Sequence, residues 1–310
     1  MLKISRKKIK KILPVVFFCL VVVLGVLVYV WLENRRPPVL EVYVMSLKSG
    51  QSVFIRTPND KRILIDGGTN SEIIRYISSI LPFYARNIDK IIVTTADSNH
   101  VTGLIDVINR YFVGEVIVPG VSLEDFELAS SSDQIYQTFI DIANKAKIPI
   151  RKVLAGDMIS LDNVSATSSV KLDVLFPVAS SSFIYSKASG PELVAKISYG
   201  STSIMLAGDV TPKIQKFIAS SSPDLKSEVL IFSQNAITNN IAATFMTVAE
   251  PDQLVYSKSK GTTVKMAAKV STKIKPDPLA GIPEDQRFNI REVGELRIVS
   301  DGKSIEIIKQ

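Results

Sequence analysis

Residues 42–68 read VYVMSLKSGQSVFIRTPNDKRILIDGG, and residues 91–104 read IIVTTADSNHVTGL. Short runs rich in Val and Ile, separated by Pro-Asn-Asp and Asp-Gly-Gly, predict strands that are joined by tight turns. Between the two stretches, isoleucines recur at helical spacing and predict a helix over residues 70–80. Three strands, a helix and a further strand in this order indicate a layered α/β domain.

The rest of the chain continues this alternation of strands and helices. Further runs rich in Val and Ile predict strands at 115–118, 170–176, 195–199, 203–207, 228–232, 253–256, 295–299 and 304–307. Further helices are expected at 104–111, 133–146, 212–220 and 240–248. We therefore expect one α/β domain over residues 40–310, with the Lys-, Ser- and Pro-rich stretch 257–286 as a mobile loop.

The positive charge of the chain is concentrated at its N-terminus. The whole chain has a formal net charge of +7. Residues 1–36 hold eight Lys or Arg and one acid, which leaves 29 basic and 29 acidic residues in 37–310. The body of the chain is therefore neutral, and the total charge does not by itself indicate a nucleic-acid-binding protein.

Residues 12–32, ILPVVFFCLVVVLGVLVYVWL, contain no charged side chain. As a helix this segment would be about 30 Å long, the thickness of the hydrocarbon core of a bilayer. Because more cations precede it than follow it, we expect residues 1–11 in the cytoplasm, one transmembrane helix, a linker at 33–39 and an extracytoplasmic domain at the cell membrane. A cleaved signal peptide is the alternative, although the apolar run is long for one and no A-x-A-like site follows. The one cysteine, Cys19, lies in this segment, so the domain can form no disulfide.

The order of motifs resembles the metallo-β-lactamase superfamily, and most closely the extracytoplasmic domain of the ComEC-type proteins of DNA uptake. The matching segments are the loop 46–52, the Leu-Ile-Asp-Gly-Gly of 64–68, the segment 95–104 and the Ala-Gly-Asp of 207–209. The resemblance covers about residues 40–310 and implies an αββα sandwich. In that family, His and Asp ligands hold two metal ions, commonly zinc, which activate a water molecule for hydrolysis.

This sequence departs from the family at most of the positions that hold the metal. Thr95 stands in place of the first His of the ligand motif, and Asn99 in place of the Asp beside the last His. Gln234 falls near the position of a later His, and the loop 46–52 lacks both acidic residues of the family motif. The positions that keep the residue expected from the resemblance are Asp66, Asp97, His100 and Asp209.

The number of available ligands argues against a zinc hydrolase. A catalytic zinc needs about three protein ligands, and a two-metal site needs more. The chain has a single His, so no His-rich zinc cluster can form. We therefore expect a pseudoenzyme without a cofactor. The alternative is one divalent cation (Zn²⁺, Mg²⁺ or Ca²⁺) held by Asp97, His100 and Asp209.

Each retained residue also has a purely structural interpretation. Asp97 can cap the helix that follows it, because carboxylates accept hydrogen bonds from the first N–H groups of a helix. His100 can hydrogen-bond within the loop at the start of that helix. Asp66 and Asp209 can each fix the turn that follows a strand.

The remaining function classes differ in their support. No Gly-rich nucleotide loop and no nucleophile elbow occurs, so dinucleotide-binding, P-loop and esterase functions lack support. We expect a membrane-anchored binding or scaffold module, with a protein partner in the cell envelope and a connection to competence. The alternatives are a residual hydrolase of the phosphodiesterase or nuclease type and a DNA-binding module of DNA uptake. Nucleic acid is not favoured because the domain is neutral, although lysines between 258 and 273 could form a basic patch.

Overall fold

The computed structural model describes residues 6–33, 38–48, 50–121, 131–165, 168–179, 192–233, 241–257, 279 and 281–310. Most of the predicted loop 257–286 and the candidate residue Gln234 lie outside these ranges. The chain divides into two units, Met1–Pro38 and Val39–Gln310.

The first unit contains one long helix, α1 (Arg6–Glu33). The large apolar side chains described between Val15 and Tyr29 are between 47% and 68% exposed. No helix in the described part of the chain is long and apolar enough to cross a membrane, so the transmembrane helix expected at 12–32 is not supported.

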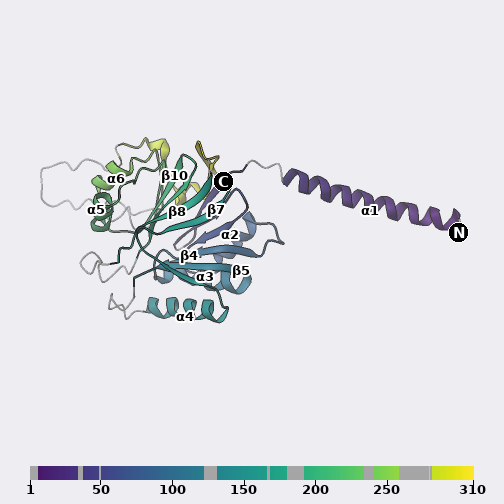
Figure 1. The fold of residues 1–310 in the computed structure, drawn as a ribbon, viewed down its shortest axis with the longest axis horizontal. Coiled ribbons are helices and arrows are strands. Elements are labelled where there is room, and N and C mark those ends of the chain that lie inside the picture. Colours follow the sequence, from purple (N-terminus) through teal and green to yellow (C-terminus); the bar gives the residue numbers. More distant parts are fainter. Residues whose placement is uncertain are drawn as a thin grey trace. The chain divides into compact units, whose positions relative to one another are not determined.

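The second unit contains two sheets (Figure 1). The first sheet has the order β15-β14-β1-β2-β3-β4-β5-β6, with the strands β1 (Leu40–Ser46), β2 (Gln51–Arg56), β3 (Arg62–Ile65), β4 (Asn87–Ile92), β5 (Phe112–Pro119), β6 (Ile150–Val153), β14 (Leu296–Ser300) and β15 (Ile305–Lys309). The second sheet has the order β13-β12-β11-β10-β9-β8-β7, with β7 (Met158–Asn163), β8 (Ser169–Phe176), β9 (Val194–Tyr199), β10 (Thr202–Gly208), β11 (Val229–Phe232), β12 (Gln253–Tyr256) and β13 (Arg287–Asn289). The helices of this unit are α2 (Glu72–Ile80), α3 (Ser98–Arg110), α4 (Ser131–Lys145), α5 (Pro212–Ser221), α6 (Ala243–Ala249) and α7 (Ile290–Val293), with the 3₁₀ turn η2 (Glu284–Gln286).

Three hydrophobic clusters define the layers. Along β1, Val42 and Val44 point into the cluster between the two sheets, while Tyr43 and Met45 point into the cluster under α2, α3 and α4. A third cluster lies between the outer face of the second sheet and the helices α5 and α6. A strand with both faces buried is apolar throughout, as β11 (VLIF) is. The αββα sandwich expected from the resemblance is therefore confirmed by the packing of this unit (Figure 1).

The sequence predicted most of these elements and missed the polar ones. The sequence does not predict β6, β7 and β13, because their short sequences IRKV, MISLDN and RFN are about half charged or polar. The helix expected at 104–111 begins six residues earlier, at Ser98.

Candidate functional site

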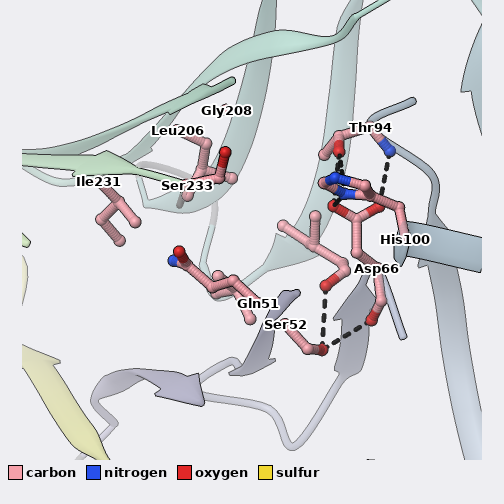
Figure 2. A pocket seen from close by; sticks show the side chains of 11 residues that line it. Gln51, Ser52, Asp66, Thr94, His100, Leu206, Gly208, Ile231 and Ser233 are labelled. Atoms are coloured by element: carbon pink, nitrogen blue, oxygen red, sulfur yellow. Dashed lines mark hydrogen bonds and ion pairs between the residues drawn. The ribbon is translucent and has the colours of Figure 1, made fainter. Parts of the chain in front are cut away.

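Asp66 lies directly after β3 and forms the centre of a buried hydrogen-bond network. Its φ of 58° is in the left-handed region, and the residue is 6% exposed. Its carboxylate accepts hydrogen bonds from the Thr94 backbone N–H at 2.8 Å and from Thr94 Oγ1 at 2.5 Å. His100 Nδ1 lies 2.8 Å from Asp66 Oδ2 (Figure 2). The network therefore joins the ends of β3 and β4 to the first turn of α3.

His100 is held as the hydrogen-bond donor of this pair. A carboxylate only accepts, so the proton of the ring lies on Nδ1, and Thr94 Oγ1 is a second neighbour at 3.3 Å. Burial lowers the pKa of His100, but the charge and hydrogen bond of Asp66 outweigh it, with smaller contributions from Asp97 and Asp209. The net result is a pKa raised above 6.5, which favours the imidazolium form.

Close backbone packing explains the glycines around this network. Gly67 N–H donates to the carbonyl of His100 at 2.7 Å, and Gly103 N–H donates to the carbonyl of Gly68 at 2.9 Å. A Cβ at Gly103 would lie 2.1 Å from the oxygen of Gly67. The glycines of both quoted motifs thus allow α3 to pack against the turn after β3.

Asp97 acts as the N-cap of α3. Its carboxylate accepts a hydrogen bond from the Asn99 N–H at 2.7 Å, which confirms the capping role expected from the sequence. Asn99 itself is exposed. Thr95 is 6% exposed and forms an isolated antiparallel bridge with Glu192.

Glu192 is a site residue that the sequence did not reveal. It is 5% exposed, and its Oε2 atom has no hydrogen-bond partner among the described residues. Burial is the main cause that raises its pKa from 4.5 to about 8; the charge of Asp209 contributes to the rise and that of His100 opposes it. The only sequence signal is an acid placed directly before the apolar strand β9.

The donor set does not fit the metal centre that the resemblance implies. Asp97 is engaged at the helix end. His100 Nδ1 is bonded to Asp66, so Nε2 is the one ring nitrogen that a metal could use. Asp209 follows β10 and is near enough to raise the pKa values of His100 and Glu192. Among the described residues, however, no three His, Cys, Asp or Glu side chains form a group that could hold a metal ion. The ligand set Asp97, His100 and Asp209 is thus not assembled in the described part of the chain.

A small pocket lies beside the network, between inner strands of the two sheets, β2 and β3 of the first and β10 and β11 of the second (Figure 2). Its volume is about 40 Å³, room for a few water-sized groups. Gln51 Oε1 and Ser233 Oγ are buried and have no hydrogen-bond partner among the described residues. The lining residues are Gln51, Ser52, Val53, Ile65, Asp66, Thr94, His100, Leu206, Gly208, Ile231 and Ser233.

Two hydroxyl groups of the pocket, those of Ser52 and Thr94, are already used as donors. Ser52 Oγ lies 2.6 Å from the Asp66 carbonyl oxygen and 3.1 Å from that of Ile65. Thr94 Oγ1 donates to Asp66. Neither hydroxyl is paired with a free base, so the arrangement stabilises the junction of β3, β4 and α3 and does not present an activated nucleophile.

Comparisons with known proteins agree with the architecture. No family model matches the chain, and no curated protein matches it. Similar solved structures are metallo-β-lactamase-fold proteins and relatives of that shape. They include a long form of RNase Z from yeast (11% identity, TM-score 0.45, 79% of this chain and 40% of that chain) and YhfI from Bacillus subtilis (11%, 0.42, 70% and 85%). CmlA, a diiron β-hydroxylase from Streptomyces venezuelae, is similar at 13% identity and a TM-score of 0.43 over 69% of this chain and 44% of that chain.

The chain spans less than half the length of the RNase Z and CmlA chains. At these identities and TM-scores the likenesses concern shape alone. The fold assignment rests on the sheet order and the three packed layers of this chain.

Proposed function

We propose that the chain is a metallo-β-lactamase-like domain without hydrolase activity, which acts as a binding or scaffold module. The observation that carries this proposal is that Asp97 caps α3 while Thr95 and Asn99 stand in place of two ligands of the family motif. The only histidine of the chain donates through Nδ1 to Asp66, which leaves Nε2 for at most one metal bond. A histidine held in this way ties α3 to the first sheet. The residues that resemble the family motif then serve the fold and not a metal.

The test is an assay of hydrolysis with the full chain. The purified protein is incubated with Zn²⁺, Mn²⁺, Mg²⁺ or Ca²⁺, and the cleavage of bis(p-nitrophenyl) phosphate and of single-stranded DNA is followed. We expect no turnover above that of the His100→Ala variant, which serves as the matched control. Metal-dependent turnover that is lost in His100→Ala would establish the residual hydrolase instead.

The more specific part of this proposal is that the domain is related to the ComEC-type proteins. It rests on the motifs at 46–52, 64–68, 95–104 and 207–209, of which the first and third are altered. A module of DNA uptake that contacts DNA directly would bind it with an affinity that falls steeply with salt. Absence of DNA binding at low salt would limit the role to protein partners.

We also propose an extracytoplasmic location at the cell membrane, with residues 1–11 in the cytoplasm. This proposal rests on the uncharged sequence 12–32 and on the cations before it. The test is extraction of membranes at alkaline pH, with the full chain and a chain that lacks residues 1–36. We expect only the full chain to remain with the membrane. In cells whose wall has been removed but whose membrane is intact, we expect protease added to the medium to digest the domain.

A further inference from the structure

The loops that lead into β4, β5 and β6 meet at one end of the first sheet. These three strands run parallel to one another and to β3, so their first residues lie at the same end. Phe112 N–H donates to the Arg86 carbonyl at 2.7 Å, and Val116 N–H donates to the Pro149 carbonyl at 2.8 Å. These bonds hold the loops 81–87, 109–114 and 144–149 side by side, at the end of the sheet opposite Asp66. We call this surface the aromatic–basic end.

The aromatic–basic end exposes three aromatic side chains. Phe83 is 88% exposed, Phe112 is 81% exposed and Tyr84 is 58% exposed. Phe83 and Tyr84 occupy the middle of a turn that is closed by a hydrogen bond from Ala85 N–H to the Pro82 carbonyl at 2.9 Å. Phe83 leaves most of its ring exposed at the tip of this turn, and grouped exposed apolar side chains are characteristic of an interaction site.

The three loops are basic and contain no acid, and the acids that follow them, Asp89 and Glu115, are paired with Lys61 and Lys90. Four exposed cations lie in the three loops: Arg86, Arg110, Lys145 and Lys147. No Asp or Glu occurs in 81–87, 109–114 or 144–149. Within the described residues, no ion pair joins these cations to a carboxylate. Arg110 and Lys145 also complement the C-terminal ends of α3 and α4, but Arg86 and Lys147 lie outside the helices.

The chain enters the second unit at this end. β1 and β3 both run antiparallel to β2, so Leu40, the first residue of β1, lies at the same end of the sheet as the first residues of β3 to β6. The segment before Leu40 leads back to α1, whose described apolar side chains are exposed. A bilayer that holds residues 12–32 is therefore connected covalently to the unit at the aromatic–basic end.

We propose that the aromatic–basic end docks on the surface of an anionic lipid bilayer. Phe83 and Phe112 insert at the level of the headgroups, and the four cations lie over the anionic lipids. Single-stranded nucleic acid is the other anionic partner of such a surface. The rings of Phe83 and Tyr84 meet edge to face, at 82° with centroids 5.5 Å apart, and do not offer the parallel faces on which successive bases stack. This geometry favours the bilayer.

The proposal can be tested without α1, because residues 39–310 form a compact unit whose three hydrophobic clusters consist only of its own residues. Its outcome is thus independent of the proposed location of residues 1–36 and of the proposed lack of hydrolase activity. The unit is sedimented with vesicles of phosphatidylcholine alone or with phosphatidylglycerol added, at low and at high salt. We expect binding to the anionic vesicles only, and weaker binding at high salt.

Two double variants separate the two parts of the surface. Phe83→Ser with Phe112→Ser removes the apolar part, and Arg86→Glu with Lys147→Glu reverses charge outside the helices. Each is expected to weaken vesicle binding by at least about tenfold. Met158→Ser is the matched control, because Met158 is 54% exposed at the start of β7, outside the aromatic–basic end.

Three results would overturn the proposal. The first is no binding of the wild-type unit to anionic vesicles at low salt. The second is an equal loss of binding in the Met158→Ser control. The third is binding of single-stranded oligothymidine, lost in both double variants, without binding to vesicles; this would make the surface a nucleic-acid site. Circular dichroism of every variant shows that the fold is retained.

Discussion

The two ends of the parallel part of the first sheet differ in the burial and bonding of their side chains. At the carboxyl ends of β3 and β4, Asp66 and Thr94 are buried, His100 is partly buried, and both Thr94 and His100 are bonded to Asp66. At the amino ends of β4 and β5, Phe83 and Phe112 are exposed and stand beside exposed cations. At the first end, Asp66, Thr94 and His100 bind one another, whereas the second end presents apolar and charged groups to the outside.

This difference separates residues that maintain the fold from residues that are available to a partner. The end that resembles a catalytic centre contributes to stability, because buried polar groups are favourable only when they are bonded. The other end contributes little to stability, because its side chains make few contacts. Substitutions at the first end should therefore change the free energy of unfolding, and those at the second end should change binding.

Asp66→Ala is expected to have the largest effect. It leaves the Thr94 N–H and the buried His100 without their acceptor, and alanine is strained at a φ of 58°. We expect a loss of about 3–5 kcal/mol in the free energy of unfolding, measured by urea denaturation. Asp66→Asn separates charge from backbone strain, since Asn tolerates the left-handed region. The helix cap variant Asp97→Ala is expected to lose about 1 kcal/mol. If Asp66→Ala loses no more than this, the central position of Asp66 is contradicted.

Glu192→Gln is expected to stabilise the domain at alkaline pH. The pKa of Glu192 is raised from 4.5 to about 8, so the folded state keeps a proton that the unfolded state releases. The wild type therefore loses stability as the pH rises from about 4.5 to 8, and the glutamine variant does not. At pH 8 we expect the variant to be more stable by about 2–4 kcal/mol. A variant with the same pH dependence as the wild type would show that Glu192 is not the group concerned.

His100→Ala is expected to have a smaller effect that depends on pH in a defined direction. The pKa of His100 is raised above 6.5, so the stabilisation by the imidazolium–Asp66 pair is complete below pH 6.5 and is lost as the pH rises through the folded pKa. Below pH 6.5 we expect the variant to be less stable than the wild type by about 1.5–3 kcal/mol. Denaturation at several pH values measures this difference. A difference that grows with pH would exclude the pair.

Phe83→Ser with Phe112→Ser is expected to have the smallest effect on stability. Both side chains are more than 80% exposed, so their removal should change the free energy of unfolding by no more than about 0.5 kcal/mol. Thermal unfolding of the double variant measures this directly. A loss of several kcal/mol would mean that the aromatic–basic end is part of the packing of the domain, and would remove the contrast between the two ends.

The sequence predicted the layers because their signal is local. The apolar run Val42–Met45 is typical of a strand that is buried on both faces, the isoleucines of α2 mark its buried face, and Asp97 before α3 is a recognisable cap. The sequence also predicts the motif residues Asp66 and His100 as candidates. Asp66 directly follows β3 and His100 follows β4 within a few residues, and they meet because these strands are parallel neighbours.

The rest depends on contacts between distant segments. Glu192 reaches the site because Thr95 pairs with it across nearly a hundred residues of sequence, and no local pattern indicates that pairing. The exposure of Phe83 and Phe112 is equally invisible in the sequence, where each appears as an ordinary apolar residue beside a predicted helix or strand.

The state of the single histidine gives the most direct test of the claim that the motif residues serve the fold. Because the chain has one His, its imidazole gives one set of ¹⁵N resonances, which can be followed by NMR during a titration with Zn²⁺. We predict a protonated Nδ1, a pKa above 6.5 and no change in either ring nitrogen when Zn²⁺ is added. A stoichiometric shift of a ring nitrogen to a metal-bound position would contradict this account.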